Sequence, residues 1–289
     1  MTWRILELFS GLGAWRWAAG DRGAVAAAYD ISSVANEAYE LSHGDRPIAK
    51  ELATLPAETL AAHGADTWLL SPPCQPYCRM GQRKDLADRR SRALVHLLDL
   101  LGQAPPERLA LENVEGFAGS ETHALLLTGL AHHGLQYREF RLCPTRFGIP
   151  NQRPRYFLVA SRRPLRFLDP PSAPPGPVGE LLDPEEREEL YLDPDLLSRH
   201  GPGLDIVTAE SRRTACFIGG YGRRYVGSGS FLKTARGIRR FSPTEVARLM
   251  RLPETLRFPE HCPLEVRYRL LGNALTVPVA RWALDAFAD

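Results

Sequence analysis

An α/β fold with a mainly parallel sheet is the fold class that this 289-residue sequence predicts. Three observations support it. Short apolar segments of strand length alternate with helix-length segments over about residues 3–160. The first strand segment leads directly into a glycine turn and a helical segment. An acidic residue closes the second strand segment, and polar groups at strand ends lie where open α/β sheets bind ligands.

The N-terminal segments have the pattern of a cofactor-binding unit. Trp3–Phe9 is expected to form a strand, and it runs into Ser10–Trp15, a glycine turn followed by a helical stretch. Glycines let the backbone approach a ligand and a helix start offers free N–H groups, although a tight turn without a ligand has the same pattern. Ala24–Tyr29 is the second strand. Asp30 at its end is placed to accept hydrogen bonds from a ribose diol.

The middle of the chain continues the alternation of strands and helices. A serine at a helix start offers an oxygen to the unpaired N–H groups, and a glycine after the last turn accepts a left-handed conformation. The predicted elements are a helix capped by Ser32 or Ser33 and reaching about Ser42, a strand over Thr67–Leu70, a helix over Ser91–Leu101 ended by Gly102, a strand over Leu109–Leu111, a helix from Ser120 to about Gly134, and strands over Gln136–Leu142 and Tyr156–Ala160.

Composition indicates an ordinary globular protein, and the cysteines and the lack of a membrane span predict a location in the cytosol or the nucleus, with the cytoplasm as the expected one. The 36 Lys+Arg and 34 Asp+Glu residues give a net charge of only +2, which does not by itself indicate a nucleic-acid partner. The five cysteines are an odd number without a CxxC pair, so we expect neither a disulfide framework nor a metal site. No apolar run has the length of a membrane span, and no segment indicates an obligate protein partner.

The composition changes near residue 168 and predicts a second domain. Five prolines between positions 170 and 177 read as a linker, and an acidic stretch and a glycine-rich stretch follow. We expect residues 1–167 to form the first part of a catalytic domain, residues 168–238 a small target-recognition domain, and residues 239–289 a segment that returns to the catalytic domain. Ser242 to Glu245 form a capping box that opens a helix through Met250.

A thiol, a carboxyl group and two guanidinium groups follow predicted strands. Cys74 lies between prolines in Ser71–Tyr77, Glu112 follows one strand, and Arg153 and Arg155 precede another. Facing one crevice, such groups suit covalent activation of an electron-poor ring, with the thiolate as nucleophile and the carboxyl group as hydrogen-bond donor. Each residue alone is commonly structural: a buried cysteine, a helix cap and a solvated turn. Their joint occurrence favours the functional interpretation.

The chain resembles the C5-cytosine methyltransferases over roughly residues 1–160 and 239–285. Six motifs occur in family order, which makes the resemblance specific. They are Phe9-Ser10-Gly11-Leu12-Gly13, Asp30 as the ribose-binding acid, Ser71-Pro72-Pro73-Cys74-Gln75-Pro76, Glu112-Asn113-Val114, Gln152-Arg153-Pro154-Arg155, and Gly272-Asn273. The resemblance implies a Rossmann-like S-adenosylmethionine-dependent methyltransferase fold with a mixed, mostly parallel sheet, plus the small target-recognition domain.

The resemblance also implies a cofactor and a mechanism. The cofactor would be S-adenosylmethionine, with S-adenosylhomocysteine as product. Cys74 would add to C6 of a cytosine flipped out of its stack, and Glu112 would protonate or hydrogen-bond N3. Arg153 and Arg155 would anchor the base carbonyl and a nearby phosphate, with Arg155 also holding the loop. The residues expected to bind the cofactor are Phe9, Ser10, Gly11, Leu12, Gly13, Asp30, Ile31, Glu51, Pro73, Asn273 and Leu275.

The segment between Ala160 and Arg239 favours tRNA over DNA as substrate. It has only about 80 residues, whereas DNA-modifying members carry a longer recognition domain. Cys216–Gly222 and Gly227–Ser230 are similar to the signature of the tRNA-aspartate methyltransferase branch, although Ile218 replaces a threonine. The residues expected to bind substrate are Gln75, Arg79, Cys216, Phe217, Tyr221, Arg223 and Arg224.

The resemblance therefore predicts methylation of cytosine 38 in a tRNA anticodon loop, with tRNA-Asp as the expected tRNA. A base is extracted from a single-stranded loop at lower cost than from a duplex. Two alternatives stay open: a DNA cytosine-5 methyltransferase of a modification system, and a catalytically silent RNA-binding protein. Intact Cys74, Glu112, Gly11 and Gly13 count against the silent scaffold.

Overall fold

The protein folds into two compact units. The structure is a computed structural model and describes residues 2–78 and 84–287. The first unit comprises Met1–Leu142, Pro154–Asp169 and Pro278–Asp289, and the second comprises Cys143–Arg153 and Pro170–Val277. No helix in the described ranges is both long and apolar enough to cross a lipid bilayer.

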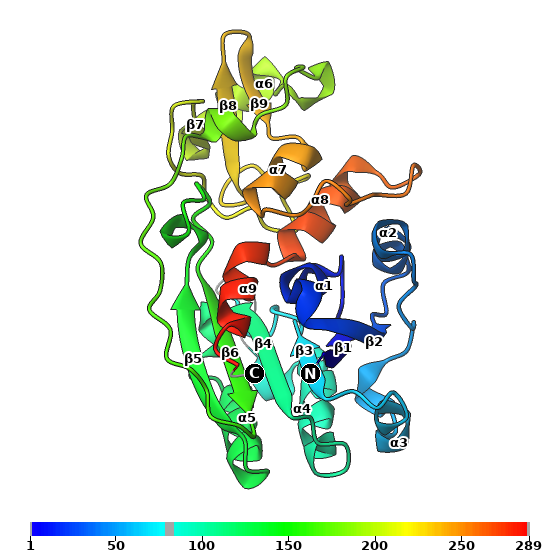
Figure 1. Cartoon of the computed structure of the whole chain (residues 1–289). Helices are drawn as coiled ribbons and strands as arrows, with labels where there is room; N and C mark the ends of the chain where they lie inside the picture. Colours follow the sequence, from blue (N-terminus) through cyan, green and yellow to red (C-terminus); the bar gives the residue numbers. More distant parts are fainter. Residues whose placement is uncertain (1, 79–83, 288–289) are drawn as a thin grey trace. The chain divides into compact units, whose positions relative to one another are not determined.

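A six-stranded sheet forms the centre of the first unit (Figure 1). Its strand order is β2-β1-β3-β4-β6-β5. The four strands β2, β1, β3 and β4 run parallel, and β6 runs antiparallel to both β4 and β5, so the predicted mixed, mostly parallel sheet is confirmed. The strands are β1 (Trp3–Leu8), β2 (Gly23–Tyr29), β3 (Thr67–Leu70), β4 (Arg108–Val114), β5 (Gln136–Leu142) and β6 (Arg155–Ser161).

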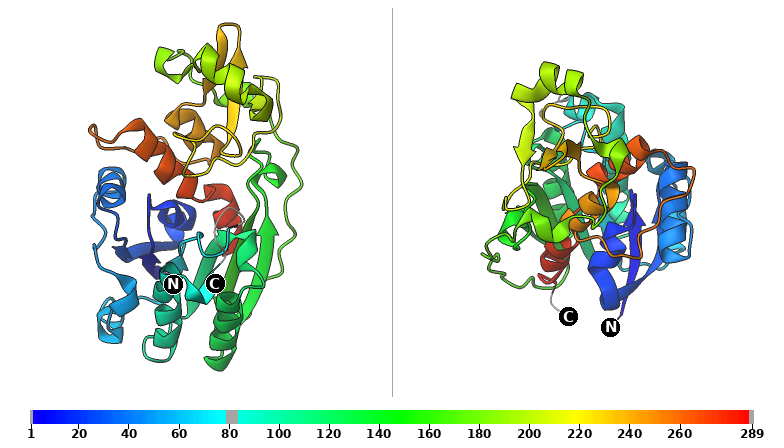
Figure 2. Two further views of the ribbon diagram at one scale, coloured as in Figure 1. Left: turned by 180° about the vertical axis from the view of Figure 1, so that it is seen from behind. Right: turned by 90° about the horizontal axis from the view of Figure 1, so that it is seen from above.

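Helices cover both faces of this sheet. Leu158 packs in the core cluster with Leu97 of α4 and Leu126 of α5, whereas its neighbour Phe157 points to the other face and meets Trp15 of α1. The view from behind in Figure 2 shows α4 and α5 on their face of the sheet. The helices of this unit are α1 (Ala14–Ala19), α2 (Ser33–His43), α3 (Ala57–Ala61), α4 (Arg92–Asp99), α5 (Glu121–His132) and α9 (Val277–Leu284).

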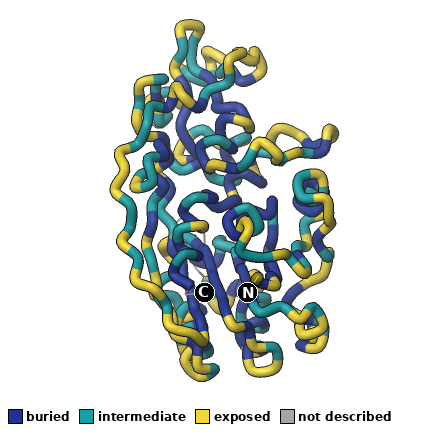
Figure 3. Tube along the Cα trace, in the orientation of Figure 1, coloured by how far each residue is buried: buried dark blue, intermediate teal, exposed yellow. Residues whose placement is uncertain are grey.

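The local signals in the sequence explain these boundaries. The Ser32 side chain accepts a hydrogen bond from the Ala35 N–H at the start of α2, and Ser120 accepts one from His123 at the start of α5. Every residue of β3 is buried, in agreement with a central strand covered on both faces (Figure 3). One boundary differs from the expectation: Glu112 lies inside β4 and not after it, because the antiparallel pairing with β6 extends to Val114.

The second unit contains a small three-stranded sheet in the order β7-β8-β9. Strand β8 pairs parallel with β7 and antiparallel with β9. An aromatic cluster packs in this unit: the Tyr221 ring lies 4.8 Å from Phe217, 5.5 Å from Phe231 and 5.0 Å from Tyr268 between centroids. The elements are β7 (Asp205–Val207), β8 (Ser230–Thr234), β9 (Gly237–Arg240), α6 (Pro194–His200), α7 (Pro243–Leu249) and α8 (Leu264–Asn273).

The second unit is larger than the small domain expected from the sequence. Residues 239–277, which we expected to return to the catalytic domain, belong to it, and so do residues 143–153. The physical reason is a set of buried polar contacts. Arg239 donates to both carboxylate oxygens of Glu245, and the Tyr268 hydroxyl donates to the Phe241 carbonyl at 2.6 Å. The predicted capping box is confirmed, because Ser242 and Glu245 bond reciprocally at the start of α7.

Candidate active site

The loop that carries Cys74 is fixed to its surroundings by hydrogen bonds. It follows β3, and Ser71 donates its N–H to the Leu8 carbonyl of β1 at 3.3 Å. The Trp15 indole N–H donates to the Ser71 hydroxyl at 3.0 Å, and the Asn113 amide donates to the Pro72 carbonyl at 3.1 Å. These contacts and the fixed φ angles of the prolines restrict the backbone of Ser71–Pro73, the part of the loop that precedes the Cys74 thiol. Cys74 itself is half-buried.

Glu112 lies beside the base of this loop. In the pairing of β3 with β4, Leu70 faces Leu111, so Glu112 lies one residue beyond the end of β3, where the loop begins. Its carboxyl group is 3.2 Å from the Nε of Arg155, and its residue surface is 6% exposed. Arg155 pairs with Val114 in the β4–β6 ladder, which puts its side chain on the same face as Glu112. The carboxyl group is thus held in place by a charge-assisted contact.

The glycine turn after β1 has a backbone conformation that few residues adopt. Gly11 and Gly13 have φ values of 52° and 77°, and Phe9 has a φ of 59°. A side chain at Gly13 would collide with the His43 ring, with Nε2 at 2.2 Å from the added Cβ. The Ser10 hydroxyl is buried and has no hydrogen-bond partner among the described residues. A buried hydroxyl without a partner is a site where a ligand atom would be stabilised.

Asp30 supports this turn from the end of β2. Its carboxylate accepts the Gly11 N–H at 2.9 Å and the Ser32 N–H at 2.8 Å. Burial raises the pKa of Asp30, and the bonds from Ser32 and Gly11 oppose that rise. A carboxylate has about four acceptor positions, so room remains for hydroxyl donors of a ligand. The next residue, Ile31, exposes 74% of its surface, and Glu51 is also exposed.

Arg153 belongs to the second unit and is 2% exposed. Its guanidinium donates to the carbonyls of Phe217, Gly272 and Ala274 at 2.7, 2.8 and 2.7 Å. These bonds join three segments of the second unit through one buried guanidinium. The expected role of Arg153 at the base stays a prediction.

The motif Gly272-Asn273 takes part in the same packing. A Cβ on Gly272 would lie 2.2 Å from the Gly219 nitrogen, so this close approach needs glycine. Asn273 is exposed, whereas Leu275 is 3% exposed.

Phe217 and Tyr221 are core residues of the second unit, each 1% exposed. The Tyr221 hydroxyl donates to the Ser230 carbonyl at 2.7 Å and accepts the Phe241 N–H at 2.9 Å. Both side chains pack in the core of this unit, and their expected contact with substrate stays a prediction. Cys216 is half-buried, with its sulfur 3.3 Å from an Arg153 nitrogen.

The other residues expected to bind substrate differ in exposure. Arg223 and Arg224 are exposed. The Gln75 side-chain oxygen is buried and has no partner among the described residues. Arg79 lies outside the described residues.

Comparison with known proteins identifies the family. The family model of the C-5 cytosine-specific DNA methylases matches residues 3–188 and 206–287. The chain belongs to this family. A human relative, tRNA (cytosine(38)-C(5))-methyltransferase, is 32% identical, with 96% of each chain covered. A DNA (cytosine-5)-methyltransferase of Dictyostelium discoideum is 30% identical over 96% of this chain and 92% of the relative. The crystal structure of the Schizosaccharomyces pombe Dnmt2 methyltransferase has a TM-score of 0.89 at 28% identity, covering 99% of this chain and 98% of that one.

Membership of the cytosine C5-methyltransferases makes the protein an enzyme that uses a methyl donor. Asn113 contributes to this site although we did not expect it among the site residues. It is 2% exposed, and its bond to Pro72 holds the Cys74 loop. Its place in the sequence, directly after Glu112, was the one sign that this amide could contribute to the site.

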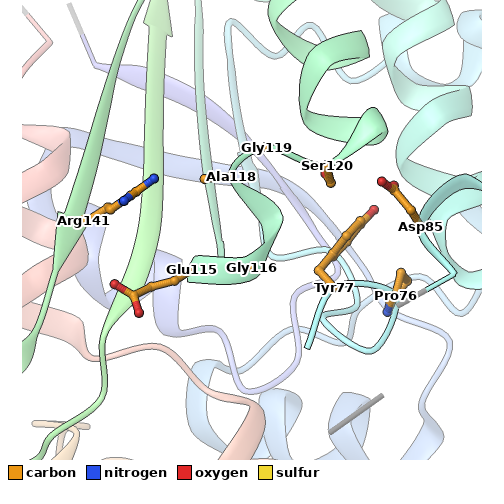
Figure 4. Close-up of a pocket in the computed structure, with 9 residues that line it drawn as sticks. All are labelled: Pro76, Tyr77, Asp85, Glu115, Gly116, Ala118, Gly119, Ser120 and Arg141. Carbon is orange, nitrogen blue, oxygen red and sulfur yellow. The ribbon is translucent and has the colours of Figure 1, made fainter. Parts of the chain in front are cut away.

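A pocket of this methyltransferase lies beside the Cys74 loop, within the first unit. Figure 4 shows Tyr77 and Pro76 of the loop facing Asp85 and the turn at Glu115–Gly116. Neither Cys74 nor Glu112 lines it. A Cβ on Gly116 would lie 2.4 Å from the Tyr77 carbonyl oxygen, so the loop rests directly on this turn. Burial raises the pKa of Tyr77 to about 12. We interpret this pocket as the back of the loop and not as the reaction centre.

Proposed function

We propose that the protein methylates C5 of cytosine 38 in a tRNA anticodon loop, with S-adenosylmethionine as methyl donor. The observation that carries the chemistry is the juxtaposition of Glu112 with the start of the Cys74 loop. The acid and the loop come from neighbouring parallel strands, and Asn113, next to that acid, bonds the loop directly. The carboxyl edge of such strands is where α/β folds bind ligands.

The proposed reaction uses Cys74 as nucleophile. Its thiolate adds to C6 of the flipped cytosine, while Glu112, positioned by Arg155 and in its protonated form, donates its proton to N3 and so takes up the charge that develops on the ring. The bound donor supplies an electrophilic methyl group, which C5 accepts. A base then removes the C5 proton, and the thiolate leaves C6 to restore the aromatic ring. Arg155 therefore acts through Glu112.

The residues of the first unit fit the proposed donor. The Ser10 hydroxyl lacks a protein partner, and Asp30 retains acceptor positions for the ribose diol. The exposed Ile31 side chain offers an apolar surface to the adenine, and Glu51 offers an acceptor for its amino group. Phe9, Leu12, Pro73, Asn273 and Leu275 remain predictions from the family resemblance.

The choice of tRNA is supported by the named human relative and by the short segment between Ala160 and Arg239. Exposed arginines at positions 212, 213, 223 and 224 give the second unit a positive surface that suits a phosphate backbone. The Dictyostelium discoideum relative keeps duplex DNA as the second candidate substrate. The preference for tRNA-Asp and the cytoplasmic location stay predictions.

Methyl transfer from labelled S-adenosylmethionine tests the proposal. We expect label in a tRNA-Asp transcript, none in the same transcript with uridine at position 38, and none in duplex DNA. Cys74→Ala should abolish transfer to tRNA but leave binding of S-adenosylmethionine, measured by calorimetry, unchanged. Cys78→Ala removes a thiol four positions away and is the matched control that should stay active.

Two outcomes would contradict the proposal. Turnover by Cys74→Ala would exclude the covalent mechanism. Label in duplex DNA with none in tRNA would show that the enzyme methylates cytosine by the same reaction but that its substrate is DNA and not tRNA.

A further inference from the structure

An aromatic stack lies at the surface of the second unit, apart from the residues assigned above. His200, the last residue of α6, is exposed, and its ring stacks on the half-buried Tyr225 with centroids 5.3 Å apart and an interplanar angle of 11°. Tyr225 also stacks against Phe231 of β8 at 6.4 Å and 23°. Figure 1 shows α6, β8 and β9 gathered in one region of this unit. The exposed His200 ring thus lies at the surface end of the stack, and the buried Phe231 ring lies at its inner end.

Arg240, the last residue of β9, lies against this stack. It is 8% exposed, and its guanidinium carbon is 4.6 Å from the Tyr225 ring centroid, 5.5 Å from Phe231 and 5.8 Å from Tyr221. Cation–π contacts hold the guanidinium but do not use its N–H donors in the ring plane. In the part of the chain that the structure describes, no carboxylate or carbonyl accepts a hydrogen bond from it.

The neighbouring Arg239 has a carboxylate acceptor, whereas no such acceptor is described for Arg240. Arg239 is 3% exposed and donates to both oxygens of Glu245, at 2.8 and 2.7 Å. Among the described residues, the Arg240 nitrogens have no such acceptor and are not buried from solvent, so their N–H groups are available to an oxygen of another molecule. An anionic or carbonyl oxygen from another molecule would complete the bonds of Arg240.

The surroundings of the stack are basic. Arg223 and Arg224 precede Tyr225 directly and are exposed, and Val226 after it is 54% exposed. Among the described residues, Glu265 is the acid nearest to Arg223, 3.7 Å away and itself exposed. Positive charge beside accessible aromatic rings is the surface that binds single-stranded nucleic acid, because unpaired bases stack on the rings and phosphates meet the cations. A duplex keeps its base faces covered and fits this surface less well.

We propose that His200, Tyr225 and Arg240 form a nucleotide subsite for an unpaired nucleotide of the tRNA. The base stacks on the exposed His200 ring, which Tyr225 supports from its other side, and a phosphate of a neighbouring nucleotide accepts from Arg240. Arg223 and Arg224 flank the phosphate backbone. The proposal rests on tRNA being the substrate.

Binding of the full-length chain to a tRNA-Asp transcript tests the subsite. We expect His200→Ala, at an exposed position that does not endanger folding, to raise Kd about ten-fold, the size of one lost base stack, and Tyr225→Leu, which removes the ring that supports His200, to raise it several-fold. Tyr225→Phe keeps the ring and should bind like the wild type. Arg240→Gln should weaken binding and reduce the dependence of Kd on salt concentration. Arg46→Gln, an exposed arginine of the first unit, is the matched control.

Kinetics separate the subsite from a structural effect. His200→Ala and Tyr225→Leu should raise KM for tRNA and keep kcat at saturating tRNA and the KM for S-adenosylmethionine. Unchanged KM for tRNA in both variants would overturn the subsite while leaving tRNA methylation intact. A wild-type enzyme that methylates only duplex DNA would overturn the proposed function itself. Adenosine or cytidine monophosphate bound as tightly as tRNA, with the same sensitivity to Tyr225→Leu, would overturn the assignment to tRNA.

Discussion

The two units bury their polar groups in different ways. The first unit packs an almost wholly apolar cluster between α4, α5 and the sheet, and its buried carboxyl groups include Glu7 and Glu112 near the ends of strands. The second unit buries Arg153, Arg239 and Arg240 among aromatic rings and backbone carbonyls. The comparison indicates that apolar packing stabilises the first unit, so its polar groups are available for chemistry. In the second unit, hydrogen bonds from Arg153 and Arg239 and cation–π contacts of Arg240 join segments that are distant in sequence.

The largest expected effect on stability is in the second unit. Glu245→Ala removes the acceptor of the buried Arg239, where the side chains are 3% and 0% exposed, and also the capping box of α7. Removing one partner of a buried pair leaves an uncompensated charge, which costs about 3–5 kcal/mol. Urea denaturation of the full chain, followed by the fluorescence of its tryptophans and tyrosines, measures this loss.

A double variant distinguishes the isolated charge from the loss of packing. Arg239→Met combined with Glu245→Leu replaces the pair by apolar side chains of similar size, and we expect it to recover much of the lost stability. Equal losses in Glu245→Ala and in the double variant would show that the pair itself, and not the isolated arginine, sets the stability of the second unit.

Buried Glu7 should make the stability of the first unit depend on pH. Glu7 of β1 is 0% exposed, and burial raises its pKa from 4.5 to about 7 against the opposing hydrogen bond from the Tyr39 hydroxyl at 2.9 Å. The folded state therefore binds this proton more tightly than the unfolded state. The resulting stability is fully present below pH 4.5 and is lost as pH rises through about 7, by about 3 kcal/mol in total.

Glu7→Gln removes the titrating group and keeps an amide that accepts from Tyr39. The free energy of unfolding of the wild type relative to this variant should fall between pH 5 and pH 8. A constant difference across that range would show that Glu7 keeps an ordinary pKa. Glu40→Gln, on the exposed face of α2, is the matched control, and the free energy of unfolding of the wild type relative to this variant should depend little on pH.

Local sequence signals predicted most of the first unit and less of the second. The strand Gln136–Leu142 was predicted with its observed ends, because periodicity and turn residues act over a few positions. The role of Arg153 was not predictable in this way. Its partners Phe217 and Ala274 lie 64 and 121 positions further along the chain. The residue types do not show whether an arginine bonds the backbone of its own chain or a nucleobase.

The site shows the same division. Element order predicted that the Cys74 loop and Glu112 lie on neighbouring parallel strands, and the pairing of Leu70 with Leu111 places Glu112 beside the start of that loop, whereas their catalytic roles stay predictions. The extent of the second unit depends on pairs such as Arg239 and Glu245, whose residue types are those of an ordinary solvated helix start. Burial separates the two cases, and burial is a property of the assembled fold.

The smallest expected effect on the free energy of unfolding is at an exposed ion pair, Arg46 with Glu40, in contrast to the buried pair of Arg239 with Glu245. Arg46 and Glu40 are 2.7 Å apart, close to the 2.7 Å of Arg239 and Glu245, but their side chains are 49% and 44% exposed. Water solvates both charges whether or not they pair, so Glu40→Gln should cost less than about 0.5 kcal/mol, and 0.5 M salt should abolish even that. Urea denaturation at two salt concentrations measures it. A loss comparable to that of Glu245→Ala would mean that pairing distance, and not burial, sets the energy of these contacts.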